Sequence, residues 1–257
     1  LGTYKNKVVS MGLSAPINTG FTRITGGSKR VEEGYPVDYF YGFVTEGIFQ
    51  SYDEIRNHAV QTAGTDPTTS TAPGDIKFKD LNGDGIINDL DRTNIGNFNP
   101  TFTYGITNTV TVKNFELSFF LQGSQGNKIL NFTRWYTEGG VSNGNYSKDV
   151  INRWTSYGTS NTMPRLVLND PNGNNRVSDR FVEDGSYIRM KNVRISYNLP
   201  SKWMSTKATK KAQIYVSAQN LFTITNYSGM DPEVGGGVDI GFYPQARTFL
   251  AGVTIDF

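Results

Sequence analysis

The sequence contains no cysteine and only one histidine, which excludes several kinds of chemistry at the start. Without cysteine, neither a disulfide framework nor a thiolate metal site can form. The lone histidine, His58, cannot build a zinc site with other histidines, and no strand-turn-helix nucleophile motif accompanies it. We expect His58 to be a solvated loop residue, and we expect the chain not to be an enzyme.

The sequence also lacks a large excess of charge of one sign and lacks long apolar runs. The 25 basic and 23 acidic residues leave a net charge of +2, too small to attract a polyanion, so nucleic acid is not expected as a partner. No apolar run approaches the roughly 18 to 20 residues that a membrane helix needs. The start, Leu1-Gly2-Thr3-Tyr4, has neither an initiator methionine nor an export leader. We therefore expect either a removed start or a piece of a longer protein.

The abundant residues favour short strands and turns. Aromatic residues make up 13% of the chain, with 28 glycines and 14 tyrosines. The last segment alternates most clearly: Phe249, Ala251, Val253, Ile255 and Phe257 share one face, and the other face carries Thr248, Leu250, Gly252, Thr254 and Asp256. A strand has this pattern when it separates lipid from a wet lumen, and a sandwich strand with one solvated face has it too.

Two other alternating segments predict a tight hairpin. Phe102 to Val112 and Phe115 to Leu121 are separated only by Lys113 and Asn114. In a two-residue hairpin the flanking positions pair directly and point the same way. Val112 opposite Phe115 therefore keeps both apolar sets on one face.

The remaining strand candidates complete the expected fold. They are Val37 to Phe49, Tyr187 to Asn198, Lys211 to Leu221 and, more weakly, Phe21 to Arg30 and Lys7 to Leu13. This makes about seven or eight strands of roughly ten residues, the length of a tilted membrane strand. Long and short connections alternate, as when every second turn is periplasmic and the others are external. Residues 1–257 are therefore expected to be all-β, a transmembrane antiparallel β-barrel segment with long extracellular loops.

A calcium-type loop occupies residues 80–91 of the first long connection. Calcium prefers six to eight oxygen ligands, and a glycine at the sixth position, here Gly85, permits the required sharp turn. The loop ends in aspartate rather than glutamate and no helical pattern flanks it, so we expect structural Ca²⁺ rather than a sensor. The alternative is that these residues merely build consecutive turns. The expected ligands are Asp80, Asn82, Asp84, the carbonyl of Ile86, and Asp91.

Eight segments are spread along nearly the whole chain: Phe40 to Gln50, Pro73 to Asp80, Ile95 to Gly105, Phe120 to Asn127, Asn152 to Thr155, Ser186 to Asn192, Gln219 to Thr223, and Tyr243 to Phe249. Each is weak alone. Together, and in this order, they resemble the C-terminal barrel region of the SusC/RagA family of TonB-dependent transporters.

The resemblance implies a nutrient importer in the outer membrane of a Gram-negative cell. Such a barrel has about 22 strands around a plug, is energised by TonB, and is covered outside by a SusD-like lipoprotein. Glycan fragments or oligopeptides are the implied cargo. Seven or eight strands cannot close this barrel. The expected partners are therefore the remainder of the barrel and plug, the SusD-like lipoprotein, TonB acting through the missing N-terminal part, and outer-membrane lipid.

Two groups of residues are candidates for roles in such a transporter. Aromatic residues of the proposed external loops can stack on sugars or contact the lid, with loop packing or girdle anchoring as the alternative; they are Trp135, Tyr136, Trp154, Tyr157 and Tyr227. The last strand resembles the signal of the barrel-assembly machinery, and a terminal aromatic at the membrane interface is the plainer interpretation. The residues concerned are Phe249, Val253, Ile255 and Phe257.

Two other functions stay open at this point: a small self-closed outer-membrane barrel, and a secreted calcium-binding carbohydrate-binding module or enzyme. The segment Gly235 to Gly237 lacks the lysine and helix of a nucleotide loop, so a flexible loop is expected there. Loop carboxylates are expected to serve solubility rather than hydrolysis. These are Glu138, Asp149, Glu183 and Asp184.

Overall fold

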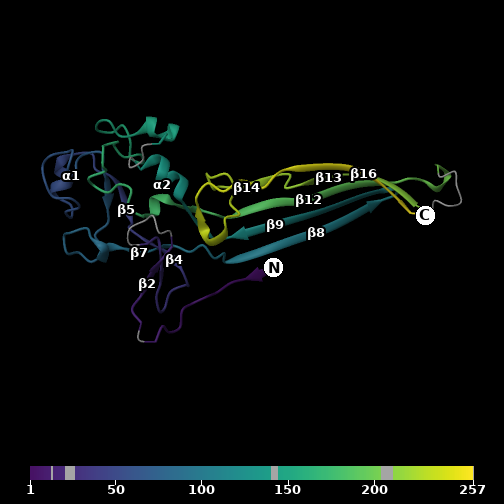
Figure 1. The fold of residues 1–257 in the computed structure, drawn as a ribbon, viewed down its shortest axis with the longest axis horizontal. Helices are drawn as coiled ribbons and strands as arrows, with labels where there is room; N and C mark the ends of the chain where they lie inside the picture. The colour runs from purple at the N-terminus through teal and green to yellow at the C-terminus, as the bar shows by residue number, and fades with distance from the viewer. Residues whose placement is uncertain (13, 21–26, 140–143, 204–210, 257) are drawn as a thin grey trace.

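The computed structural model describes residues 1–12, 14–20, 27–139, 144–203 and 211–256. The chain has two parts, an extended sheet of long strands and a body of loops and short strands at one end of it (Figure 1). The all-β class is confirmed by the order of the elements. In these described ranges, no helix is both long and apolar enough to cross a bilayer.

Within the described residues, five long strands of 9 to 12 residues form the extended sheet: β8 (Phe102–Val112), β9 (Phe115–Gln125), β12 (Tyr187–Asn198), β13 (Lys211–Gln219) and β16 (Thr248–Asp256). Their order is β8-β9-β12-β13-β16, and every neighbouring pair is antiparallel. Two short strands also belong to this sheet. β1 (Gly2–Thr3) pairs with β8 at the edge of the sheet, and β14 (Thr223–Thr225) pairs with the first residues of β12. The long strands match the roughly 9 to 11 residues of a tilted membrane strand.

The tight hairpin forms as the sequence predicts. Val112 pairs with Phe115, and the ladder continues without a slip to Phe102 opposite Gln125. Lys113, the first turn residue, has a φ of 55°. Positive φ in a two-residue turn matches the twist of the flanking strands, so the turn fixes the register.

The extended sheet has an apolar face and a polar face. Apolar neighbours pair across every ladder, for example Ile195 with Val216 and Val216 with Ala251. Their side chains stay exposed, with Val112 at 62%, Phe249 at 67% and Val253 at 61%. No second layer covers them among the described residues, which argues against a sandwich. Lipid contact explains such a face.

The polar face carries threonine, serine, glutamine and charged residues at the intervening positions. Glu116 pairs with Ser196, and Arg194 pairs with Ser217. Phe120 and Leu250 are apolar exceptions on this face, as their pairing with Asn192 and Ser217 shows. A wet lumen accounts for the polar majority.

A bulge in β12 preserves this division. The register of β12 against β9 shifts between Met190 and Asn192, which leaves Lys191 as the extra residue. An inserted residue moves the following side chains by one position along the pleat. Met190 and Val193 consequently share the apolar face although they are three residues apart.

From β8 onward, long and short connections leave opposite ends of the sheet, as predicted; the predicted long connection after Val37 to Phe49 does not join two strands of this sheet. The hairpin turn and the end of β12 lie far from the body, while residues 126–186 and 220–247 leave from the body end (Figure 1). One end of the sheet therefore carries nearly all of the loop mass.

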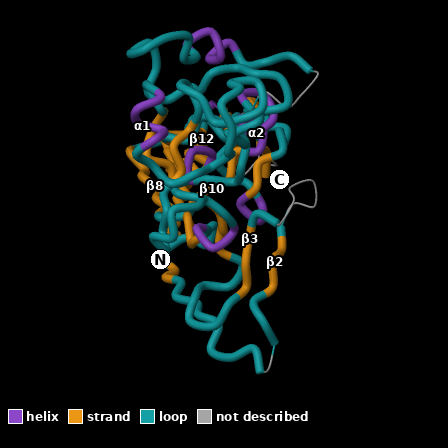
Figure 2. The backbone as a smooth tube through the Cα atoms, turned by 90° about the vertical axis from the view of Figure 1, so that its left-hand side faces the viewer, coloured by secondary structure: helices purple, strands orange, loops and turns teal. Residues whose placement is uncertain are grey.

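In the described part of the body, short strands form three small sheets. They are β2 (Ile17–Thr19), β3 (Lys29–Val31), β4 (Tyr39–Gly42) and β7 (Thr93–Gly96); β10 (Lys128–Asn131), β11 (Val182–Asp184) and β15 (Val238–Asp239); and β5 (Thr45–Ile48) with β6 (Ile76–Phe78). The helices α1 (Tyr52–Arg56) and α2 (Phe132–Glu138) are short. The hairpin of β2 and β3 extends away from the other elements (Figure 2).

The strand predicted over Val37 to Phe49 is not a strand of the extended sheet. It divides into β4 and β5, which belong to different small sheets. All four residues of β4 are buried, and Phe40 and Phe43 lie in two separate hydrophobic clusters. Burial on both faces places this segment in the packed core of the body rather than against lipid.

The two weaker strand predictions also differ from the structure. Residues 7–12 form no strand in the described ranges, and the prediction of Phe21 to Arg30 falls largely on residues 21–26, outside them. Among the described residues β16 pairs only with β13, and β8 is covered on its outer side only by β1. The sheet is therefore open, which argues against a small self-closed barrel.

Candidate functional site

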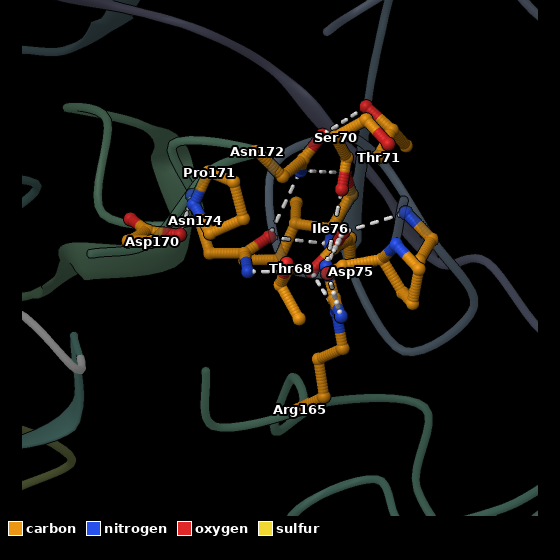
Figure 3. Close-up of polar contacts among 12 residues, drawn as sticks. Thr68, Ser70, Thr71, Asp75, Ile76, Arg165, Asp170, Pro171, Asn172 and Asn174 are labelled. Atoms are coloured by element: carbon orange, nitrogen blue, oxygen red, sulfur yellow. Dashed lines mark hydrogen bonds and ion pairs between the residues drawn. The ribbon is translucent and has the colours of Figure 1, made fainter. Parts of the chain in front are cut away.

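Two long loops of the body are joined by a buried polar network centred on Asp75 (Figure 3). Asp75 is fully buried, and both of its carboxylate oxygens accept hydrogen bonds from Arg165, at 2.7 and 2.8 Å. The main-chain N–H of Ala72 and the side-chain amide of Asn174 donate to the same carboxylate. The ion pair is thus fully hydrogen-bonded, the condition under which a buried charge is tolerated.

Asparagine side chains extend the network to the next strand. Asn174 Oδ1 accepts from the Ile76 N–H at 2.7 Å, and Asn172 Oδ1 accepts from Gln61 Nε2 and from Thr71 Oγ1, each at 2.7 Å. Residues about one hundred positions apart are therefore bonded directly. The network therefore holds the two long loops together as one unit.

The loop of residues 80–91 adopts consecutive turns stabilised by its own carboxylates. Asp80 accepts from the N–H groups of Gly83 and Gly85, at 2.7 and 2.8 Å, and Asp84 accepts from the N–H of Ile86 at 2.9 Å. Asp91 is fully buried and accepts from the N–H groups of Leu81 and Asn88. These bonds are those that the turn interpretation requires.

Calcium binding by the loop of residues 80–91 stays a prediction. Hydrogen bonds from the Gly85 and Gly83 N–H groups hold the pKa of Asp80 below its usual value, so this carboxylate is charged at neutral pH. Each ionised carboxylate has about four acceptor sites, so oxygen sites stay free after these bonds. Nevertheless, among the described residues no three His, Asp or Glu side chains are gathered closely enough to hold a metal ion.

Three of the five candidate aromatic residues are packed into the body. Trp135 stacks on Phe132 with ring centroids 4.5 Å apart and donates to the carbonyl of Asn175 at 2.6 Å. Trp154 donates to Gln50 Oε1 at 3.0 Å. Tyr227 is 6% exposed and donates to Asp239 Oδ2 at 2.5 Å; burial and this bond raise the pKa of its phenol.

The other two aromatic residues face outward, with Tyr136 at 47% and Tyr157 at 78% exposure. These two have surface available for a ligand or a lid. Contact of any of the five with cargo or lid stays a prediction.

A cavity of about 570 Å³ opens beside α2. Arg134 lines this cavity and pairs with Glu138 and with Glu183, each at 2.8 Å. Arg180 also pairs with Glu138, at 2.8 Å. Burial lowers the pKa of Arg180 to about 10, against the opposing effect of Glu138. Glu138 and Glu183 are thus structural partners, and the expectation that they serve only solubility is wrong.

A second charged cluster ties the last long loop to the polar face of the sheet. Arg189, 3% exposed, pairs with Asp231 and with Glu233, each at 2.6 Å, and Lys191 pairs with Glu233 at 2.8 Å. Gln122, its neighbour on β9, also donates to Glu233. Residues 231–233 therefore lie over the polar face at the body end of the sheet.

His58 is more enclosed than expected. Its side chain is 15% exposed and lies 3.5 Å from Glu46 Oε2. The ring also packs edge-on against Phe49, with centroids 5.2 Å apart. His58 does lie in a loop, but the expectation that its side chain is solvated is wrong.

Three of the four residues of the candidate assembly signal lie on the exposed apolar face. Phe249, Val253 and Ile255 of β16 pair with Ala218, Ile214 and Ala212 of β13. Phe257, the fourth candidate, lies outside the described residues. Recognition by assembly machinery stays a prediction.

Sequence reasoning missed the residues that hold the body together, namely Asp75, Arg165, Arg134, Arg180 and Arg189. Most of their partners are far away in the chain: Arg165 lies 90 positions after Asp75, and Glu183 lies 49 positions after Arg134, although Glu138 is only four positions from Arg134. The sequence shows such residues only as single charges inside apolar or turn-rich segments, and this pattern does not identify their partners.

A scan against protein-family models gives no match. Among curated proteins, the chain is 35% identical over 239 residues to the TonB-dependent receptor P3 of Formosa agariphila, covering 88% of this chain and 23% of that protein. It is 31% identical over 187 residues to the TonB-dependent receptor SusC of Bacteroides thetaiotaomicron, covering 72% of this chain and 18% of SusC. The chain thus spans about a quarter or less of these relatives.

Among solved structures, the RagAB peptide transporter is similar, with a TM-score of 0.71 and 25% identity over 90% of this chain and 24% of that one. The RagAB peptide importer in its open-open state has a TM-score of 0.68 at 23% identity, over 97% of this chain and 25% of that one, which supports the fold alone.

Proposed function

This chain is a SusC/RagA-like segment of a TonB-dependent receptor, and from this premise we propose that it forms one sector of the wall of an outer-membrane nutrient importer. The two faces of the extended sheet carry the proposal, since exposed apolar side chains face lipid and polar ones face a lumen. Both outer edges of the sheet need further strands, because unpaired backbone groups are costly in a bilayer. The remainder of the barrel and its plug would supply those strands and fill the lumen.

The body belongs on the external side in this proposal, because the short turns lie at the opposite end. Its rigid loops then form the wall of the cargo cavity and the seat of a SusD-like lipoprotein. TonB acts on the plug from the periplasm, and the chain takes part in import rather than in catalysis. Glycan fragments or oligopeptides are the proposed cargo; one similar structure is named a peptide transporter.

We also propose that the loop of residues 80–91 holds a structural Ca²⁺. Its ligand spacing, its glycine at the sixth position and its charged carboxylates fit the ion. Asp80, Asn82, Asp84, the carbonyl of Ile86, and Asp91 would provide the oxygens. The ion would hold the turns together at a loop surface.

Uptake by whole cells tests the import proposal. The complete receptor that contains this chain is expressed with its neighbouring lipoprotein, and uptake of fluorescent oligopeptides and oligosaccharides is measured with and without TonB. We expect uptake of one of the two classes that is lost without TonB, and copurification of the lipoprotein with the receptor in detergent. Uptake unaffected by loss of TonB, or a receptor found outside the outer membrane, would contradict the proposal.

A further inference from the structure

The cavity beside α2 has an excess of negative charge. The described lining contains four carboxylates, of Glu138, Asp149, Glu183 and Asp239, and one cation, Arg134. Arg134 is already paired with Glu138 and Glu183, and Arg180, outside the lining, pairs with Glu138 as well. The negative charge without an ion pair in the described lining therefore belongs to Asp149 and Asp239, and Arg134 is not free for an anionic ligand. An anionic cargo would be repelled here, while a cationic group would be attracted.

Asp149 offers the most accessible acceptor in this cavity. Its side chain is exposed, and one oxygen accepts a hydrogen bond from Ser147 Oγ at 3.0 Å. No ion pair of Asp149 is present among the described residues. By contrast, Asp239 is 4% exposed and accepts from Tyr227 and from the Gly241 N–H.

The apolar part of the lining fits a long aliphatic chain better than a sugar ring. Met163 and Met230 line the cavity, and none of the described lining residues is aromatic. Sugar rings are commonly bound against aromatic faces, whereas a lysine or arginine stem packs along flexible apolar groups such as methionine. Both features together favour a basic side chain.

The cavity also adjoins a smaller hollow at the polar face of the sheet. Met230 lines both this cavity and a smaller hollow of about 290 Å³ that contains Arg189 and Asp231. The pair of Arg189 and Asp231 anchors the loop that forms this wall. A ligand in the cavity would therefore lie next to the route through the lumen.

We propose that this cavity binds the basic side chain or the terminal ammonium group of an oligopeptide. Asp149 is the carboxylate that meets the cation, and the two methionines contact its aliphatic stem. The volume of about 570 Å³ lies within the range of small-ligand sites and suits one or two residues. The proposal rests on the import function and narrows its cargo to peptides with positive charge.

Binding of a matched peptide series tests this proposal. The probes are three acetylated, fluorescently labelled octapeptides of glycine and serine with one central lysine, norleucine or glutamate. Affinities are measured by fluorescence anisotropy with the complete receptor in detergent, at 0.1 and 0.5 M NaCl. We expect the lysine peptide to bind at least about tenfold more tightly than the glutamate peptide, and its advantage to shrink at high salt.

The Asp149→Asn variant assigns the effect to the cavity. This exposed position tolerates the change, so we expect intact folding and a loss of about two- to fivefold in affinity for the lysine peptide alone. Asp53→Asn, an exposed carboxylate of α1 that pairs with Arg56 outside the cavity, is the control and should leave peptide affinity unchanged. Equal binding of lysine and norleucine peptides, or an unchanged lysine affinity in Asp149→Asn, would overturn the proposal. TonB-dependent uptake of oligosaccharides alone would reject the peptide site while leaving the import function intact.

Discussion

Asp75 is the residue at which two long loops of the body converge, and its replacement should loosen both. Asp75→Asn removes the charge partner of Arg165, whose side chain is 13% exposed, and so leaves a nearly buried guanidinium unpaired. We expect a loss of about 3 to 5 kcal/mol in the stability of the body. Hydrogen exchange of residues 61–78 and 165–175 in the complete receptor measures it.

Asp66→Asn is the control for this change, because Asp66 lies in the same loop and is exposed, with Thr68 as its hydrogen-bond donor. Its exchange rates should stay close to those of the wild type. If Asp75→Asn exchanged no faster than Asp66→Asn, the network would not hold the loops together.

Acid should loosen the body through Glu183. Burial alone would raise the pKa of Glu183, but hydrogen bonds from Arg134 and Ser228 outweigh it and hold the pKa below the usual value. A carboxylate with a depressed folded-state pKa contributes stability that is present above its unfolded pKa, about 4.3, and is lost as the pH falls through the folded value. When the pH is lowered below about 4, the thermal midpoint, followed by the fluorescence of Trp135 and Trp154, should therefore decrease. In Glu183→Gln this part of the acid dependence should be missing, and an unchanged pH profile in that variant would contradict the assignment.

At the scale of elements, neighbouring positions of β13 should respond in opposite ways to the same charge. Val216 is 53% exposed on the apolar face, and Ser217 lies on the polar face. Arginine facing the middle of a bilayer costs about 2 to 4 kcal/mol, whereas a lumen-facing arginine costs little. Val216→Arg should reduce the folded receptor in the outer membrane, measured by heat-modifiable gel mobility, and Ser217→Arg should not. Equal assembly of the two variants would argue against lipid contact at Val216.

The loop of residues 80–91 gives a second test at this scale. Asp80→Ala combined with Asp84→Ala should abolish bound calcium, measured by elemental analysis, and lower the thermal midpoint. A ligand present at one hundred times its Kd stabilises the folded state by about 2.7 kcal/mol, so the variant should lose about this much stability. Removal of calcium from the wild type by a chelator should have the same effect. Metal content and stability unchanged by the double substitution would leave only the turn interpretation.

The sequence predicted the long strands well because their two faces differ in chemistry at every step. Alternation of apolar and polar residues, broken at Phe120 and Leu250, identified β8, β9 and β16, and the two-residue turn fixed the register of the hairpin. The bulge at Lys191 escaped prediction, since it only becomes visible when β12 is aligned with β9. Val37 to Phe49 misled because a segment buried on both faces and a lipid-facing strand are both rich in apolar residues.

The body was less predictable because its contacts join distant parts of the chain. The calcium-type loop could be found from local spacing alone. The cavity beside α2 could not, since Arg134, Glu183 and Ser228 meet only after the loops have packed. Local patterns thus locate strands and turns, while the candidate cargo site depends on the tertiary fold.

At the scale of the whole molecule, the central claim is that the apolar face of the extended sheet contacts lipid. The lack of cysteine makes the chain suitable for single-cysteine labelling in a receptor free of other cysteines. Val216→Cys and Ser217→Cys are labelled in turn with an environment-sensitive fluorophore, and the receptor is placed in bilayers that contain brominated lipid. We expect strong quenching and a blue-shifted emission at position 216 and weak quenching at position 217. Equal, water-like emission without quenching at both positions would contradict the claim.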